Sequence, residues 1–318
     1  QKTAYEIGVR LVGSEMCIRD RLEYLTATKD TKRSWERDVR CAKQLRAVLG
    51  GRLMSDISPK DIWGYQTKRK QDGVKPVTIN RELAYLSTAI NFANRHWEWD
   101  LSNPVKGRKL SNVESTRTRW LTHAEADRLL EAASSEPKAP HLSDFIRLAL
   151  FTGARRGELL GLEWSRVDLR ANLIHLEAVH TKTGTPRSIP LHKEARQALI
   201  GRQRFRASFC PDAPFVFVNR DGCPIRSIRK SFSTACWRAA ISDFRIHDLR
   251  HTFASWLVTE GVPLLEVSRL LGHSTIKMTE RYAHLAPDNL KSAVSLLDHR
   301  SHSGHSVRPH QLRSVVSH

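Results

Sequence analysis

The residues with the clearest chemical potential in this 318-residue chain are a histidine and an arginine three positions apart. If their segment is helical, His247 and Arg250 share one face, because residues three apart on a helix are neighbours. A histidine can accept a proton near neutral pH, and an arginine stays charged and donates paired hydrogen bonds to phosphate oxygens. The pair suits chemistry at a phosphate group. By itself, such a pair is more often a helix cap or a surface contact.

Further residues of suitable types follow a definite order along the chain. Arg155 lies in the stretch TGARRGE, where a loop is expected to lead into a helix, and Lys182 begins the turn-rich stretch KTGTP. His273 follows a Leu-Gly pair, and Tyr282 lies in the stretch ERYAH. An isolated tyrosine is usually a half-buried aromatic residue. The series of two arginines, a lysine, two histidines and a tyrosine is more specific than any single member.

The charge of the chain indicates a polyanionic partner. Lysine and arginine number 52 against 33 acidic residues, which gives a formal net charge of +19. Such an excess attracts nucleic acid over a long range, and double-stranded DNA is the favoured partner. No apolar run approaches the ~18 residues of a spanning helix, so we expect no membrane association. The five cysteines form no Cys-x-x-Cys pair, which favours a reducing cytoplasm over a disulfide framework.

These residues must be positioned by two units of mainly helical structure. Residues 1–21 are interpreted as a non-native, adapter-derived segment and are set apart from the fold. Residues 22–112 are expected to be all helical, with Ser58 as a helix cap followed by a proline at the first helical position. A second helix there has apolar residues at helical spacing, namely Ile79, Leu83, Leu86 and Ile90. Residues 113–118 are predicted to be a linker.

The second unit is expected to span residues 119–298. Thr122 and Glu125 form a capping box that opens a helix. Residues 173–176 and 187–191 are predicted to be short strands on either side of the Lys182 turn. Three helices are expected to follow, with Gly261 and Gly272 at helix C-termini. The Ser/His-rich residues 299–318 are expected to be a disordered tail.

The ordered series resembles the tyrosine recombinases of the phage integrase family, and the resemblance covers nearly all of residues 22–298. It implies a mainly α architecture with a small antiparallel β-hairpin or sheet, in which an all-α core-binding domain precedes a mixed, mostly α catalytic domain. The residues that match the family's catalytic positions are Arg155, Lys182, His247, Arg250, His273 and Tyr282. The start of the helix around Thr78 and Arg81 is a weaker match to a DNA contact.

The resemblance implies a site-specific recombinase or integrase that works through a 3′-phosphotyrosine intermediate, without metal or cofactor. Tyr282 would attack the phosphate, and the two arginines would hold its non-bridging oxygens. His247 would help to take the tyrosine proton, and His273 would donate a hydrogen bond to the phosphate. Lys182 would protonate the departing 5′-oxygen. Glu158 would orient an arginine or a histidine.

Three alternatives stay open at this stage. His247 and His251 are four apart, a spacing at which a helix can present two zinc ligands, but no glutamate follows His247 as metalloenzyme helices require. A DNA-binding architectural protein could use the same scaffold without chemistry. A type IB topoisomerase shares similar chemistry, so the residues alone do not separate it from a recombinase.

The expected assembly is a homo-oligomer on DNA. An apolar stripe on residues 287–297 most often packs within its own chain. In the family that the sequence resembles, the corresponding helix docks on a neighbouring copy, so we expect head-to-tail association up to a tetramer. A cytoplasmic, nucleoid-associated protein follows, with accessory DNA-bending proteins as optional partners.

Overall fold

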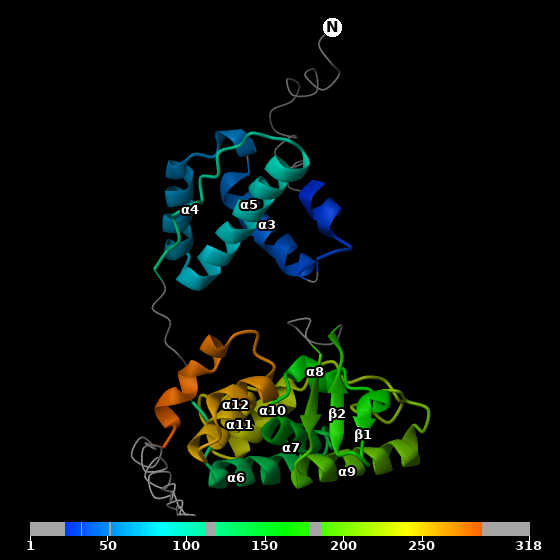
Figure 1. The fold of residues 1–318 in the computed structure, drawn as a ribbon. Coiled ribbons are helices and arrows are strands. Elements are labelled where there is room, and N and C mark those ends of the chain that lie inside the picture. The colour runs from blue at the N-terminus through cyan, green and yellow to red at the C-terminus, as the bar shows by residue number, and fades with distance from the viewer. Residues whose placement is uncertain (1–22, 33, 51, 112–118, 179–185, 288–318) are drawn as a thin grey trace, which may run out of the picture. The chain divides into compact units, whose positions relative to one another are not determined.

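The computed structural model describes residues 23–32, 34–50, 52–111, 119–178 and 186–287. The chain divides into two compact units, Gln1–Ser115 and Thr116–His318, each with its own hydrophobic core (Figure 1). Four predicted features fall wholly or almost wholly outside the described residues. These are the adapter-derived segment 1–21, the linker 113–118, the oligomerisation stripe 287–297 and the tail 299–318.

All the regular secondary structure in the described residues of the first unit is helical. Residues 23–28 are helical, and the elements that follow are α3 (Trp35–Leu49), η1 (Met54–Asp56), α4 (Pro59–Gln71) and α5 (Pro76–His96). Ser58 caps α4 as expected, because its hydroxyl accepts from the backbone of Asp61 while the carboxylate of Asp61 accepts from the backbone of Ser58. Pro59 is the first residue of α4. It has no backbone N–H, and an N–H at this position would have no acceptor within the helix.

The predicted apolar stripe of α5 forms the centre of the first unit's core. Its members are at most 1% exposed: Ile79, Leu83, Leu86 and Ile90. One charged group lies beside them. Glu82 accepts a hydrogen bond of 2.7 Å from the Tyr65 hydroxyl and two from the guanidinium of Arg69, so its buried charge is compensated.

The second unit contains helices and a small sheet. Its helices are α6 (His123–Ser134), α7 (Leu142–Thr152), α8 (Arg156–Leu160), α9 (Lys193–Phe209), α10 (Arg229–Arg238), α11 (Asp248–Thr259) and α12 (Leu264–Leu271). Short 3-10 helices are η2 (Trp164–Arg166), η4 (Ile276–Met278) and η5 (Glu280–Leu285). The strands are β1 (Val167–Asp168), β2 (Leu173–Leu176) and β3 (Arg187–Pro190), paired antiparallel in the order β1-β2-β3.

The expected fold class is confirmed, with two differences in detail. β2 pairs with β3 as the predicted hairpin, with Ile174 opposite Ile189, but β1 adds a third strand. Two residues are too few to show strand periodicity in a sequence. Four helices rather than three follow the hairpin, because α9 to α12 are separate elements. The prediction of three helices was therefore wrong.

Two glycines bring the segments of the second unit into place. Gly153 ends α7 with φ +61° and Gly272 ends α12 with φ +64°, a left-handed conformation that other residues adopt only with strain. The chain turns at Gly153 and enters α8 within three residues. α8 and the sheet lie at one side of this unit, and α11 and α12 lie at the other (Figure 1). Within the described ranges, no helix combines the length and apolar character needed to cross a membrane.

Candidate active site

Arg155 lies at the start of α8 and is fixed there by a carboxylate. Its backbone N–H donates to Glu158 at 2.8 Å, and its Nη1 donates to the other oxygen of the same carboxylate at 2.8 Å. Its Nη2 donates to the backbone oxygen of Gly272 at 3.1 Å. Arg155 therefore joins the start of α8 to the end of α12.

Arg250 lies in the first turn of α11 and points to the same place. Its side chain is buried, and its guanidinium donates to the backbone oxygens of Gly153 at 2.8 Å and Leu271 at 2.7 Å. Burial, and then the neighbouring charge of Arg155, lower the pKa of Arg250 to about 9. The guanidinium stays charged at neutral pH. Because Arg155 and Arg250 bind the carbonyls of adjacent residues, two cations 95 positions apart in sequence come together.

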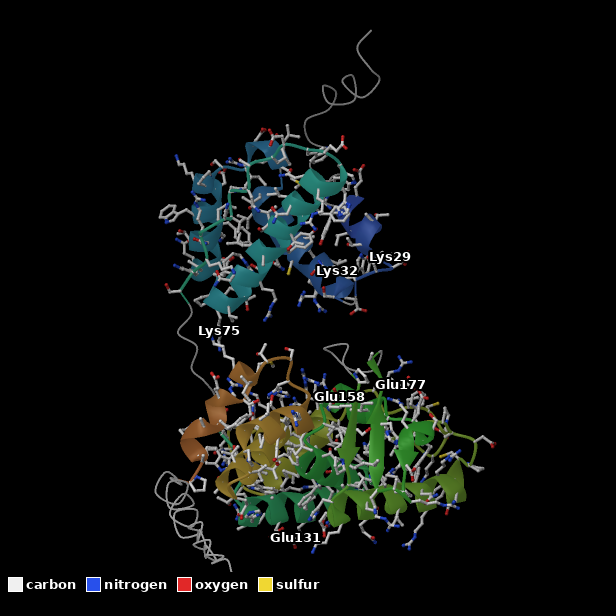
Figure 2. The ribbon with its side chains drawn as sticks, viewed as in Figure 1. Lys29, Lys32, Lys75, Glu131, Glu158 and Glu177 are labelled. Atoms are coloured by element: carbon white, nitrogen blue, oxygen red, sulfur yellow. The ribbon has the colours of Figure 1, made fainter. Side chains whose placement is uncertain are left out.

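Glu158 connects a second arginine to this group. Arg187, the first residue of β3, donates 2.6 and 3.1 Å hydrogen bonds to the two oxygens of Glu158. The Glu158 side chain is 3% exposed. Burial alone would raise its pKa, but hydrogen bonds from Arg187 and Arg155 lower it overall, so the group is an anion. Figure 2 shows Glu158 close to the ribbon of α8. It orients arginines, one of the two partners that the sequence suggested.

Four of the six predicted site residues line one cavity of about 660 Å³. They are Arg155, His247, Arg250 and His273. His247 is the residue just before α11, and its carbonyl accepts from the backbone of Arg250 and His251. A cavity wall with two cationic and two imidazole groups can bind a phosphate diester and exchange protons with it.

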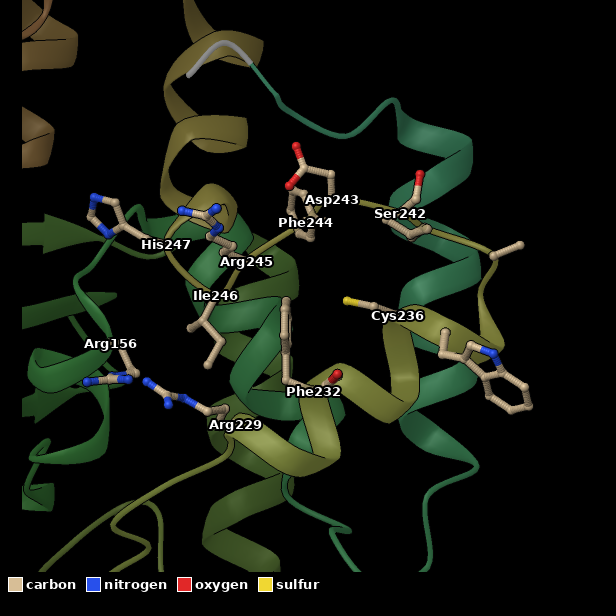
Figure 3. A pocket seen from close by; sticks show the side chains of 14 residues that line it. Arg156, Arg229, Phe232, Cys236, Ser242, Asp243, Phe244, Arg245, Ile246 and His247 are labelled. Atoms are coloured by element: carbon tan, nitrogen blue, oxygen red, sulfur yellow. The ribbon is translucent and has the colours of Figure 1, made fainter. Parts of the chain in front are cut away.

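A second cavity of about 980 Å³ adjoins the first and shares Arg156, Ile246 and His247 with it. Figure 3 shows the guanidinium groups of Arg156 and Arg229 pointing toward one another, with His247 on the same side. Arg245 also lines this cavity. Like charges that face each other across an open cavity favour an anion between them. The basic surface thus continues beyond the four residues of the first cavity.

One ring nitrogen of His273 makes a hydrogen bond with a buried hydroxyl group. Nδ1 of His273 lies 2.8 Å from the hydroxyl of Thr279, a residue with no exposed surface. Burial, then the charges of Arg250 and Arg155, lower the pKa of His273 to about 4, so the ring is neutral at physiological pH. If the Thr279 hydroxyl donates to Nδ1, the proton of the neutral ring sits on Nε2 and can be donated to a phosphate oxygen.

Tyr282 lies beside this cavity but is not among its lining residues. It is carried by η5, is 6% exposed and packs in a small core cluster with Ala254, Val258, Val267 and Leu271. Its hydroxyl lies 2.5 Å from Nδ1 of His251. Burial raises the pKa of Tyr282 to about 12, so the phenol keeps its proton at neutral pH.

The remaining predicted residues are Lys182, Thr78 and Arg81. Lys182 lies outside the described residues. Thr78 is half-buried and Arg81 is exposed, both in the first turns of α5, in the other unit. Lys75, which precedes α5, is labelled in Figure 2. Across the described residues, no group of three or more histidine, cysteine or acidic side chains could hold a metal ion.

Sequence reasoning missed two contacts at this site, those of His251 and Arg187. His251 was considered only as a partner of His247 in metal binding, although the same spacing places the two rings together, with centroids 5.0 Å apart. Arg187 was placed correctly at the start of a strand. Its pairing with Glu158 spans 29 positions, so no local pattern could have revealed it.

Comparison with known protein families gives matches over most of the chain. The model described as "Phage integrase family" matches residues 119–289, and that described as "Phage integrase, N-terminal domain" matches residues 23–110. The integrase of Escherichia phage 186 is 33% identical over 233 residues, which cover 73% of this chain. The match covers 63% of that integrase, so the chain spans less than two thirds of its relative.

Solved structures show the same fold. The Tn1549 transposon integrase in complex with a circular intermediate DNA has a TM-score of 0.69 at 22% identity, covering 88% of this chain and 99% of the other. A lambda integrase tetramer bound to a Holliday junction has a TM-score of 0.67 at 21% identity. That match covers 83% of this chain and 76% of the other.

Proposed function

Because the chain belongs to the phage integrase family, we propose that it is a site-specific DNA recombinase that cuts and rejoins strands through a 3′-phosphotyrosine intermediate. One observation carries the proposal. Arg155, His247, Arg250 and His273, which come from three separate segments of the chain, line one cavity, and Tyr282 is buried next to it.

Charge stabilisation is the main task of the proposed site. A phosphodiester repels nucleophiles because its oxygens are negative, and hydrogen bonds fixed in advance stabilise the extra charge of the transition state. Arg155 and Arg250 hold the non-bridging oxygens, and each is already bonded to a backbone carbonyl that fixes its direction. His273 donates to one of those oxygens from Nε2.

Proton transfer and the nucleophile complete the proposed reaction. Tyr282 attacks phosphorus, Lys182 protonates the departing 5′-oxygen, and His247 contributes from the cavity wall to proton movement. The phosphotyrosine bond keeps the energy of the broken phosphodiester, so a 5′-hydroxyl from another strand can rejoin it without a cofactor.

The proposed partner is double-stranded DNA, held by both basic units. Thr78 and Arg81 of the first unit contact the duplex, and Arg156, Arg229 and Arg245 bind phosphates beside the cleavage site. The fold neighbours include proteins whose structures contain DNA, and one is a tetramer. We propose assembly of this chain on DNA up to a tetramer through residues 287–297. The protein acts in the cytoplasm on nucleoid DNA, and accessory DNA-bending proteins can assist it.

Covalent trapping tests the proposed function. The unmodified chain is incubated with a nicked suicide duplex that carries the recombination site from the DNA flanking its gene. We expect a protein–DNA adduct in the presence of excess EDTA, and no adduct from Tyr282→Phe, which should still bind DNA. Absence of an adduct with the unmodified chain would favour an architectural protein. An adduct without strand exchange between two duplexes would favour a topoisomerase.

A further inference from the structure

The Tyr282 hydroxyl makes a single close contact that no assigned role explains. Nδ1 of His251 lies 2.5 Å from it, and the two rings have centroids 5.9 Å apart. The residues are 31 positions apart, on α11 and η5, so the contact comes from tertiary packing. If the Tyr282 hydroxyl had other hydrogen-bond partners, its contact with His251 would say little about the mechanism. Within the described part of the chain, His251 is its only recorded hydrogen-bond partner.

The direction of this hydrogen bond follows from burial. A phenol that is 6% exposed must donate its proton to an acceptor, because an unsatisfied buried donor is costly. Burial, then His247 and Arg281, lower the pKa of His251 to about 4, so the ring is neutral and one nitrogen has a lone pair. Nδ1 therefore accepts the hydrogen bond that the Tyr282 hydroxyl donates. Nε2 carries the ring proton of His251.

His247, by contrast, is placed to meet DNA. It is exposed and lines both cavities, whereas no recorded hydrogen bond joins it to the Tyr282 hydroxyl in the described residues. Its ring packs edge-on against His251. The two histidines thus form a layer between the cavity and the tyrosine. The proton acceptor for Tyr282 and the group that meets the phosphate are different residues.

We propose that His251 is the proton acceptor for Tyr282 during DNA cleavage, a catalytic role that rests on the proposed recombinase function. The proton of the Tyr282 hydroxyl passes to Nδ1 of His251, and the tyrosine oxygen forms a bond to phosphorus. The bond from phosphorus to the 5′-oxygen breaks, and that oxygen takes a proton from the acid assigned to Lys182. On rejoining, His251 returns its proton to Tyr282.

The surroundings of His251 suit a base that must give its proton back. The charged and titratable groups facing it are His247 just before α11, Asp248 and Arg250 on α11, His273 after α12, and Arg281 and Tyr282 on η5. Two cations oppose a lasting positive charge on the ring, and Asp248 partly offsets them. The imidazolium is therefore short-lived. A neutral resting ring also stays available as an acceptor across the physiological pH range.

The variant His251→Asn distinguishes a general base from a residue that only accepts a hydrogen bond. In His251→Asn the side-chain oxygen can occupy the place of Nδ1 and accept the hydrogen bond, but it cannot take a proton. We expect single-turnover adduct formation on the suicide duplex to fall at least about 100-fold, the usual contribution of a general base. His284→Asn changes an exposed histidine on the same 3-10 helix and should leave the rate unchanged.

The pH profile gives a signature that a structural defect would not produce. The unmodified chain should cleave at a nearly constant rate from about pH 6 to about pH 9, since neutral His251 is present throughout. His251→Asn must use hydroxide or the phenolate, so its rate should rise about tenfold per pH unit over that range. An equal rate and an equally flat profile in His251→Asn would overturn the proposal.

A sulfur leaving group tests the alternative that His251 serves as the acid. A duplex with a 5′-bridging phosphorothiolate needs no protonation of its leaving group. We expect His251→Asn to stay slow on this duplex, and rescue to the unmodified rate would show an acid and refute the base. Failure of this proposal can be told apart from failure of the proposed function. The variants are compared with an unmodified chain that has already been shown to form the adduct.

Discussion

The arginine side of the site is held by a network, whereas the tyrosine side depends on one polar contact. On the arginine side, Arg155 and Arg187 donate to Glu158, and Arg155 and Arg250 donate to three backbone carbonyls. On the tyrosine side, the hydroxyl of Tyr282 meets only His251 among recorded partners in the described residues.

The packing follows the same division. The arginine side borders a core cluster that runs through α6 to α11 and the sheet. The tyrosine side has a cluster with five buried members, and Tyr282 itself is carried by a 3-10 helix, whose hydrogen bonds are weaker than those of an α-helix. Groups that stabilise charge gain from rigidity, because no reorganisation is needed during the reaction.

Removal of the Glu158 charge should produce the largest effect and would test the rigid half of this comparison. In Glu158→Gln, Arg155 and Arg187 lose their shared buried anion. Breaking a buried ion pair at one partner costs about 3–5 kcal/mol, so urea unfolding of the second unit should shift by that amount and adduct formation should be lost. Glu194→Gln is the control, because both side chains of its ion pair with Arg147 are about one third exposed. A surface pair of this kind contributes about 0–1 kcal/mol. Equal shifts for the two variants would show that the network does not hold the arginines.

A smaller effect is expected from a substitution at Gly153, whose carbonyl oxygen accepts a hydrogen bond from Arg250. In Gly153→Ala the new Cβ would lie 2.4 Å from the Phe253 ring, at a φ of +61°. The left-handed conformation costs about 1–2 kcal/mol and the overlap a further 1–3 kcal/mol, so we expect a loss of about 2–5 kcal/mol in unfolding free energy. Gly261→Ala has the same sign of φ, +82°, with open space around it. It should show the conformational cost alone. If the two alanine variants lost equal stability, the packing around Gly153, whose carbonyl accepts from Arg250, would be looser than the structure indicates.

The sequence predicted the site residues of both sides, but it missed one long-range contact on each side. The order of site residues, the capping boxes at Ser58 and Thr122, and the terminal glycines are local patterns, because each depends on residues a few positions apart. The contact of His251 with Tyr282 depends on how η5 folds back onto α11, and that of Arg187 with Glu158 depends on strand placement. Neither leaves a local signature. β1 was missed because two residues show no periodicity.

Thr279 joins the two sides, and its removal should have the smallest of these three effects. It precedes η5, its carbonyl accepts from the backbone of Tyr282 at 2.9 Å, and its hydroxyl meets Nδ1 of His273. In Thr279→Val the shape is kept and the hydroxyl is lost, so nothing selects the Nε2–H form of the His273 ring. Loss of one neutral hydrogen bond, about 1 kcal/mol, corresponds to a cleavage rate lower by roughly five- to tenfold.

Thr279→Ser keeps the hydroxyl and should retain the rate. Nitrogen NMR of the histidine rings supplies the measurement that a packing defect would not alter, since it reports which nitrogen carries the proton. We expect the Nε2–H form in the unmodified chain and the serine variant, and a mixture in the valine variant. A valine variant with the unmodified tautomer but a slow rate would mean that Thr279 acts on Tyr282 through the backbone. The two sides would then be coupled through η5 rather than through His273, and the tyrosine side would be less independent than its single polar contact implies.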